Sequence, residues 1–216
     1  MKILSRLLLV MGLMLPLLAC AAPNANAPLV EGQDYELIDN PAPFAPLAGK
    51  VEVVEVFGYT CGHCAHFEGV LQPWLAKLPA HVRFTPVPAV FGGHWDAYAR
   101  AYYAAEQLGV AKRGHAALFD ALHEKRSLPM QGVSIEQLSG FYSAYGVDAA
   151  RYADALRSDA VNAKMKAARD FALRSGVRGT PTVIVNGKYR VRGTSMEDML
   201  RITDALIAKE RAASAR

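Results

Sequence analysis

Cysteine is scarce in this chain, with only three in 216 residues. They are Cys20, near the amino end, and the pair Cys61 and Cys64. Small exported domains that rely on disulfides for stability carry more cysteines, and a structural zinc site needs four ligands. A bridge between Cys61 and Cys64 would close a very short loop, which stabilises a fold least in the chain-entropy view of disulfides. The pair is therefore poor structural reinforcement, and a redox purpose explains it better.

Net charge and long apolar runs are also limited. The chain has 24 basic and 20 acidic residues, a formal net charge of +4, and without Lys2 and Arg6 the balance is 22 − 20, or +2. Such a mild excess predicts no nucleic-acid partner. The apolar run from Leu7 to Leu18 is shorter than the roughly 20 residues that span a bilayer. Because Lys2 and Arg6 precede it, the run is typical of a secretory signal, and we expect residues 1–21 to be that signal.

Two routes of signal processing stay open. Ala19-Cys20-Ala21 fits the small-x-small cleavage rule, which would release a soluble product that begins at Ala22. Leu17-Leu18-Ala19-Cys20 also resembles a bacterial lipobox, in which cleavage before Cys20 leaves that cysteine as a lipidated first residue. The sequence therefore predicts an exported protein that is held at a membrane only if Cys20 is lipidated.

The order of the predicted elements indicates an α/β fold with a helical interruption. Dense β-branched residues and hydrophobic alternation predict strands at 35–38, 51–57, 82–87, 182–185 and 188–191. Helical periodicity predicts helices that begin near residue 61 and cover 95–108, 114–124, 134–145, 148–156, 160–174 and 194–210. Thr194 and Glu197 have capping-box spacing at the start of the last helix. Since no convincing strand occurs in 92–174, this block interrupts an α/β domain made of 28–91 and 175–216.

Cys61-Gly62-His63-Cys64 carries the predicted chemistry. The thiolate is the nucleophile in disulfide exchange. Cys61 follows a strand and a turn, so it should lie at a helix amino terminus, where free N–H groups and the helix dipole favour an anion. His63 can add positive charge or donate a hydrogen bond, and Gly62-His63 together tune the pair. Cys64 lies one turn further, within bonding reach, and is the natural resolving thiol. A zinc knuckle that recruits His66 would still lack a fourth ligand.

Two further features support this interpretation. Glu55 lies in the strand 51–57 between apolar neighbours, so we expect it to point into a buried region beneath the cysteines, where it could accept or relay the Cys64 proton. The alternative is an exposed strand residue. Thr180-Pro181 comes directly before the strand 182–185. A cis Thr180–Pro181 bond would leave backbone groups free to pair with a substrate peptide.

The stretch 53–64, which ends in Cys-Gly-His-Cys, and the stretch 177–182 together resemble the DsbA family of bacterial periplasmic thiol:disulfide interchange proteins. The resemblance extends over nearly the whole mature chain. It implies a thioredoxin fold with an inserted helical domain at 92–174. It also implies that Cys61 attacks, that Cys64 resolves and that His63 stabilises the Cys61 thiolate.

The same resemblance implies the remaining site residues. Pro181 is the cis-proline beside the active site, Thr180 lines the peptide contact, and Glu55 matches the buried acid of the family. The implied protein is a periplasmic monomer that needs no cofactor or metal. It donates its Cys61–Cys64 disulfide to reduced or unfolded exported proteins, and a quinone-linked inner-membrane oxidase of the DsbB type reoxidises it.

Two departures from the family pattern leave alternatives open. Gly62 stands where the best-known members have proline, and Cys-Gly-His-Cys also resembles eukaryotic protein disulfide isomerases. Thr180 replaces the valine of the best-known DsbA and also occurs in the isomerase DsbC. A disulfide isomerase or reductase on the same fold is therefore the first alternative, although no separate dimerisation domain is expected before Tyr35. The second is a redox-inert peptide-binding or metal-binding module.

A basic cluster lies near the Pro181 loop in the sequence. It consists of Arg174, Arg178, Lys188, Arg190 and Arg192. The simplest interpretation is a set of solvated strand and turn residues. The alternative hypothesis is a preference for acidic substrates, which salt would weaken.

Overall fold

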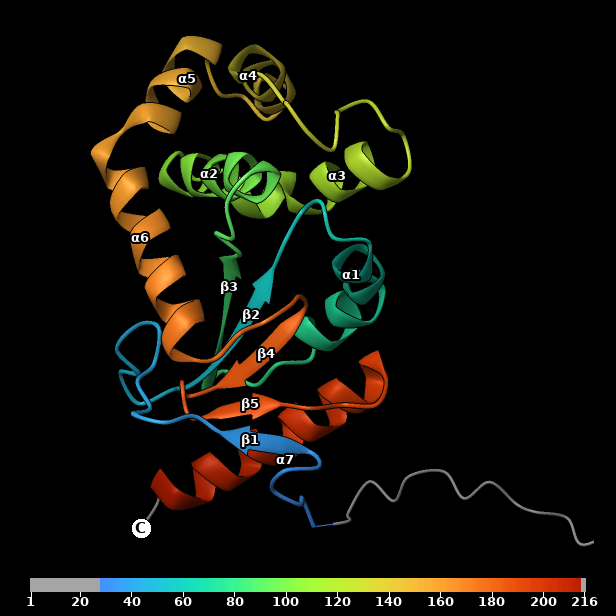
Figure 1. Cartoon of the computed structure of the whole chain (residues 1–216), viewed down its shortest axis with the longest axis vertical. Coiled ribbons are helices and arrows are strands. Elements are labelled where there is room, and N and C mark those ends of the chain that lie inside the picture. Colours follow the sequence, from blue (N-terminus) through green and yellow to red (C-terminus); the bar gives the residue numbers. More distant parts are fainter. Residues whose placement is uncertain (1–27, 215–216) are drawn as a thin grey trace, which may run out of the picture.

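The computed structural model describes residues 28–214, so the predicted signal (1–21) and Cys20 lie outside the described residues. A five-stranded sheet has the order β1-β5-β4-β2-β3, and helices cover it (Figure 1). The strands are β1 (Tyr35–Leu37), β2 (Val51–Phe57), β3 (Val82–Pro88), β4 (Thr182–Val185) and β5 (Tyr189–Val191). The helices are α1 (Gly62–Leu75), α2 (His94–Gln107), α3 (Ala111–His123), α4 (Ile135–Ser143), α5 (Ala149–Arg157), α6 (Asp159–Arg174) and α7 (Met196–Ser214).

The central strand β2 organises the fold. All seven of its residues are buried, because it pairs in parallel with β3 on one side and antiparallel with β4 on the other. Helix α1 connects β2 to β3, as expected for a βαβ unit. The antiparallel hairpin of β4 and β5 turns at Asn186 and Gly187, which both have positive φ. An Asn-Gly pair is typical of such a two-residue turn, because both positions tolerate positive φ.

Two apolar cores lie on opposite faces of the sheet. On one face, Val53 and Val183 pack with residues of α1 and α7, such as Phe67 and Leu206. On the other face, Val54, Val56 and Ile184 join a larger core that includes residues of the helices α2 to α6. These five helices fill the interval 94–174 without a strand, and the carboxyl ends of β2 and β3 point toward them (Figure 1). The loop after β2 therefore lies between the sheet and the helical block.

The capping residues predicted for the last helix are wrong by one position. The backbone N–H of Asp198 donates to the Ser195 hydroxyl at 3.1 Å, and the N–H of Thr194 donates to the Asp198 carboxylate at 3.0 Å. Ser195 and Asp198, rather than Thr194 and Glu197, thus satisfy the free N–H groups. The short Asp198 side chain reaches back to Thr194, which shifts the start of α7 to Met196.

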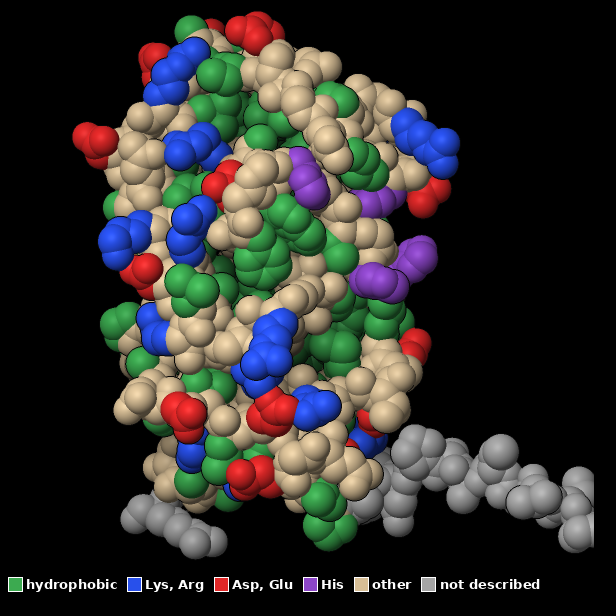
Figure 2. All heavy atoms as spheres, viewed as in Figure 1, with side chains coloured by type: hydrophobic (Ala, Val, Ile, Leu, Met, Phe, Trp, Pro, Cys, Tyr) green, Lys and Arg blue, Asp and Glu red, His purple; other side chains and the backbone are tan. Residues whose placement is uncertain are grey.

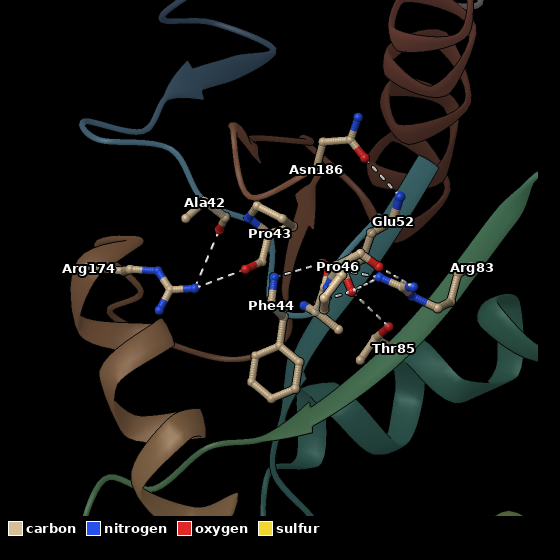
Figure 3. Close-up of polar contacts among 10 residues, drawn as sticks. Ala42, Pro43, Phe44, Pro46, Glu52, Arg83, Thr85, Arg174 and Asn186 are labelled. Carbon is tan, nitrogen blue, oxygen red and sulfur yellow. Dashed lines mark hydrogen bonds and ion pairs between the residues drawn. The ribbon is translucent and has the colours of Figure 1, made fainter. Parts of the chain in front are cut away.

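A second acidic residue of β2, Glu52, is buried and fully partnered. Its carboxylate accepts from the guanidinium of Arg83 at 2.7 Å, from the Thr85 hydroxyl at 3.3 Å, and from the N–H groups of Phe44 and Ala45 at 2.7 and 3.3 Å (Figure 3). The side chain of Glu52 is 0% exposed. This carboxylate ties the irregular segment before β2 to the sheet, and its ion-pair and hydrogen-bond partners offset the cost of its burial.

Removal of Arg83 should therefore destabilise the fold. In an Arg83→Ala variant the Glu52 carboxylate stays buried but loses its counter-ion. We expect the free energy of unfolding to fall by about 2–4 kcal/mol, which urea denaturation would measure. Lys77→Ala, which removes an exposed charge from the connection between α1 and β3, is the control. Equal stability of the two variants would contradict this role of Glu52.

Candidate active site

Cys61 occupies the position directly before α1. Its backbone is extended, with φ −91° and ψ 115°, and α1 begins at Gly62. The Cys61 N–H donates to the carbonyl of Gly58 at 3.0 Å, which closes the turn after β2. Cys61 is partly exposed, Gly62 and His63 are exposed, and Cys64 is fully buried. Both cysteines are in the free thiol form. The accessible sulfur is thus the one nearer the amino end.

The two thiols have opposite acidities. The pKa of Cys61 is lowered to about 5, chiefly by a hydrogen bond from Cys64, although partial burial acts in the other direction. The backbone N–H groups of Cys64 and His63 lower it further. The pKa of Cys64 is raised because this thiol donates to Cys61, is buried, and lies near the charge of Glu55. A Cys61 thiolate is therefore favoured over a Cys64 thiolate.

The Pro181 loop lies against the reactive sulfur. The Thr180–Pro181 peptide bond is cis, as predicted. The Cys61 thiol donates to the Thr180 carbonyl at 3.4 Å, although 119 positions separate the two residues in the chain. The Thr180 hydroxyl is buried and has no hydrogen-bond partner among residues 28–214. The structure thus brings together Cys61, Cys64 and Thr180-Pro181, as the family resemblance implied.

Glu55 is buried without a hydrogen-bond partner among residues 28–214. Its side chain is on β2, the residue is 1% exposed, and neither carboxylate oxygen has a hydrogen-bond partner within the described chain. Burial is the main reason that the pKa of Glu55 is raised well above its ordinary value, and the charges of Glu68 and Cys61 raise it further. Desolvation disfavours the charged form of such a carboxyl, so Glu55 keeps its proton to a higher pH than an exposed glutamate does. This contrasts with Glu52, whose partners stabilise its charge, and the expected burial of Glu55 is confirmed.

Known proteins resemble this chain over most of its length. Residues 86–203 match the family described as DSBA-like thioredoxin domain. A thiol:disulfide interchange protein DsbA from Pseudomonas aeruginosa is 38% identical over 186 residues, which span 85% of this chain and 86% of that protein.

The chain belongs to the DsbA family.

Solved structures of DsbA proteins share the fold. The oxidoreductase DsbA from Xylella fastidiosa is 55% identical, with a TM-score of 0.84 over 86% of this chain and 98% of the other. NmDsbA1 from Neisseria meningitidis is 30% identical, with a TM-score of 0.73 over 87% and 97% of the two chains. The protein is therefore a disulfide oxidoreductase with a DsbA-like thioredoxin fold.

Three polar neighbours of this DsbA-family site were not predicted from the sequence. They are Glu68, His115 and Tyr59. Glu68 lies four residues after Cys64 on the same face of α1, a spacing that could have revealed it. The His115 imidazole on α3 lies 3.3 Å from the Glu68 carboxylate and 2.7 Å from the Tyr59 hydroxyl. No local pattern could have placed His115 here, because α3 reaches α1 only through tertiary packing. Glu68 and His115 line a cavity of about 720 Å³ between α1, β3, α2 and α3.

Two features are absent from residues 28–214. No group of three or more His, Cys, Asp or Glu side chains is arranged to hold a metal ion in this part of the chain. None of the helices described is long and apolar enough to cross a membrane.

Proposed function

We propose that this DsbA-family protein is a dithiol oxidase that donates its Cys61–Cys64 disulfide to reduced exported proteins. The observation that carries the proposal is the difference in acidity between the paired thiols. The Cys64 thiol and the backbone N–H groups of His63 and Cys64 favour the Cys61 thiolate, so the reduced form of the enzyme is stabilised. Since a stabilised reduced form makes the disulfide a stronger oxidant, the enzyme tends to give its disulfide away.

The proposed cycle begins with the oxidised enzyme. A substrate thiolate attacks the Cys61 sulfur, the Cys61–Cys64 bond breaks, and Cys64 leaves as a thiolate that takes up a proton. A second substrate thiolate then attacks the substrate sulfur of the mixed disulfide, and Cys61 leaves as a thiolate. The substrate gains a disulfide and loses two electrons, which the two enzyme sulfurs accept. A quinone-linked membrane partner of the DsbB type would reoxidise the enzyme.

The surrounding residues have distinct roles in this proposal. Gly62 and His63 tune the cysteine pair, with His63 stabilising the Cys61 thiolate from its exposed position. Thr180 and Pro181 present the backbone with which an extended substrate pairs. Glu55 carries the proton to and from Cys64, because it is buried beside that thiol and has no competing hydrogen-bond partner among the described residues.

The location and domain division are part of the proposal. The signal at 1–21 would deliver the protein to the periplasm, either as a soluble monomer or attached through a lipid on Cys20. Residues 28–91 and 175–216 would form the thioredoxin-like domain, and 92–174 the inserted helical domain. Mass spectrometry of the mature amino terminus distinguishes the two processing routes.

Equilibration with glutathione buffers tests the proposed function. An oxidase should keep Cys61 and Cys64 reduced even in a relatively oxidising glutathione buffer, and its disulfide form should oxidise a reduced test protein. A strongly reducing potential would instead support the isomerase or reductase alternative, which Thr180 and the Cys-Gly-His-Cys sequence leave open. Absence of any exchange would support the redox-inert alternative.

Replacement of Glu55 should separate stability from catalysis. Because the pKa of Glu55 is higher in the folded protein, the folded state holds the proton more tightly, and Glu55 weakens stability increasingly as the pH rises above about 4.5. A Glu55→Gln variant should unfold with a free energy about 1–2 kcal/mol higher at neutral pH. Disulfide transfer should slow about tenfold or more, because glutamine cannot carry the proton. Urea denaturation and stopped-flow transfer rates measure the two effects, and an unchanged transfer rate would remove Glu55 from the proton path.

A further inference from the structure

A basic cavity lies beside the Pro181 loop. It has a volume of about 410 Å³, and its lining includes Arg178, Arg190 and Arg192, with Glu36 as its one acidic residue. Gly179 and Thr182, which flank Thr180-Pro181, also line it. Figure 2 shows basic side chains beside acidic ones on the face over which β4 and β5 run. The cavity is thus next to the backbone on which we place the substrate.

Only part of the basic cluster seen in the sequence lines this cavity. Lys188 pairs with Glu210 at 3.1 Å, and Arg174 donates to the carbonyl of Pro43 at 3.1 Å, away from the cavity. Neither residue lines the cavity. Only Arg178, Arg190 and Arg192 of the five remain as candidates to meet a substrate.

Two of these three arginines are held in place. The Arg190 guanidinium donates to the carbonyls of Ser175 and Gly176 at 2.7 and 2.8 Å and pairs with Glu36. Arg192 pairs with the same carboxylate. Arg178 is exposed and has no carboxylate partner among residues 28–214. Three guanidinium groups thus face one carboxylate, and the net charge of +2 is available to a ligand.

The adjoining backbone is also available. The N–H groups of Arg178, Gly179 and Thr180 donate no backbone hydrogen bond within the described chain, and the sheet pairing of β4 begins at Thr182. An extended peptide can therefore pair with 178–180. Because side chains two residues apart in an extended chain point to the same face, about 7 Å apart, a substrate cysteine near Thr180 places a second residue of the substrate opposite Arg178.

We propose that this cavity is a subsite for an acidic side chain of the substrate, two residues from its reactive cysteine. The proposal rests on the disulfide-exchange function given above and adds a substrate preference to it. The group recognised is a carboxylate. Arg178 would bind it directly, and Arg190 and Arg192, which are held in place, would add positive charge to the cavity. An aspartate or glutamate near the cysteine would speed the first attack through electrostatic attraction.

Peptide kinetics would test this subsite. Matched peptides carry one reactive cysteine with Asp, Asn or Lys two residues before or after it, and the rate of mixed-disulfide formation with the oxidised enzyme is measured at low and high salt. We expect the best Asp peptide to react about five to ten times faster than its Lys counterpart at low salt, and the difference to shrink at high salt. Arg178→Ala should reduce the preference to about twofold or less, and Arg178→Glu should reverse it.

The controls separate this proposal from the function on which it rests. Arg151→Ala removes the same charge from an exposed position on α5 and should keep the full preference. Equal rates for the Asp and Lys peptides in the unchanged enzyme would overturn the subsite and leave the oxidase intact. An equal loss of preference in the Arg151 and Arg178 variants would also overturn it, because overall charge would then explain the effect. If no peptide forms a mixed disulfide, the proposed function itself fails.

Discussion

Cys61→Ser should abolish disulfide transfer to a reduced test protein, with a loss of at least about a thousandfold. The Cys61 sulfur is the partly exposed member of the pair, and Cys64 is fully buried. A hydroxyl at position 61 cannot form the mixed disulfide, and the buried Cys64 thiol, with its raised pKa, cannot replace it. Recovery of activity by a refolding, disulfide-dependent enzyme would measure the loss.

The matched variant is Cys64→Ser, which should fail in a different way. This variant keeps the attacking sulfur and lacks the resolving one. When its free Cys61 attacks a disulfide-bonded peptide, the mixed disulfide should persist, and mass spectrometry would show the peptide attached to Cys61. Full activity of Cys61→Ser would refute the enzymatic proposal. Accumulation of the mixed disulfide on Cys64 in the Cys61 variant would reverse the assigned roles of the two sulfurs.

The second large effect is a pH-dependent difference in stability between the reduced and oxidised forms. The pKa of Cys61 is about 5 in the folded reduced protein, against an ordinary value of 9.0. The unfolded reduced chain therefore binds more protons between these two values, and the stability of the reduced form rises with pH across this interval. The contribution is complete above the ordinary pKa and is lost as the pH falls through about 5. The oxidised form has no thiol to titrate.

The expected size follows from the acidity of Cys61 and its exposure. Two pH units above a pKa of about 5 correspond to nearly 3 kcal/mol, and solvent screening of this half-exposed sulfur reduces that to about 1–2 kcal/mol at neutral pH. Thiolate stabilisation should thus raise the melting temperature of the reduced form by about 2–8 °C in a domain of this size. Melting curves of both forms from about pH 4 to pH 8 would measure the change in their difference.

A direct titration serves as the control for this prediction. The ultraviolet absorbance of the thiolate in the reduced protein should appear with a midpoint near the pKa of about 5, and it should be absent from Cys61→Ser. Cys61→Ser cannot form the disulfide, and its free energy of unfolding should lack the rise with pH that the Cys61 thiolate gives the reduced protein. A midpoint near that of ordinary cysteine would remove the energetic basis of the oxidase proposal.

The sequence by itself determined the fold class and the position of the reactive pair. Val51–Phe57 is dense in β-branched and apolar residues, and a helix with regular apolar spacing follows it. These local patterns place Cys61 at a helix start without knowledge of any distant contact. The Asn186-Gly187 turn is determined in the same way, because it depends on the φ preferences of two adjacent residues. The capping residues of α7 were mispredicted because several polar side chains at 194–198 compete for the same N–H groups.

Only the tertiary structure decided the surroundings of the cysteines. Thr180 contacts Cys61 although 119 positions separate them in the chain, and His115 contacts Glu68 because α3 packs on α1. Arg178 lines the basic cavity, whereas Arg174 and Lys188 bind other partners and do not. Glu52 and Glu55 lie in one buried strand, yet one carboxylate is fully partnered and the other is not. Periodicity fixes which way a side chain points from its own element, whereas its partners, and hence its charge and reactivity, depend on which distant segment packs against it.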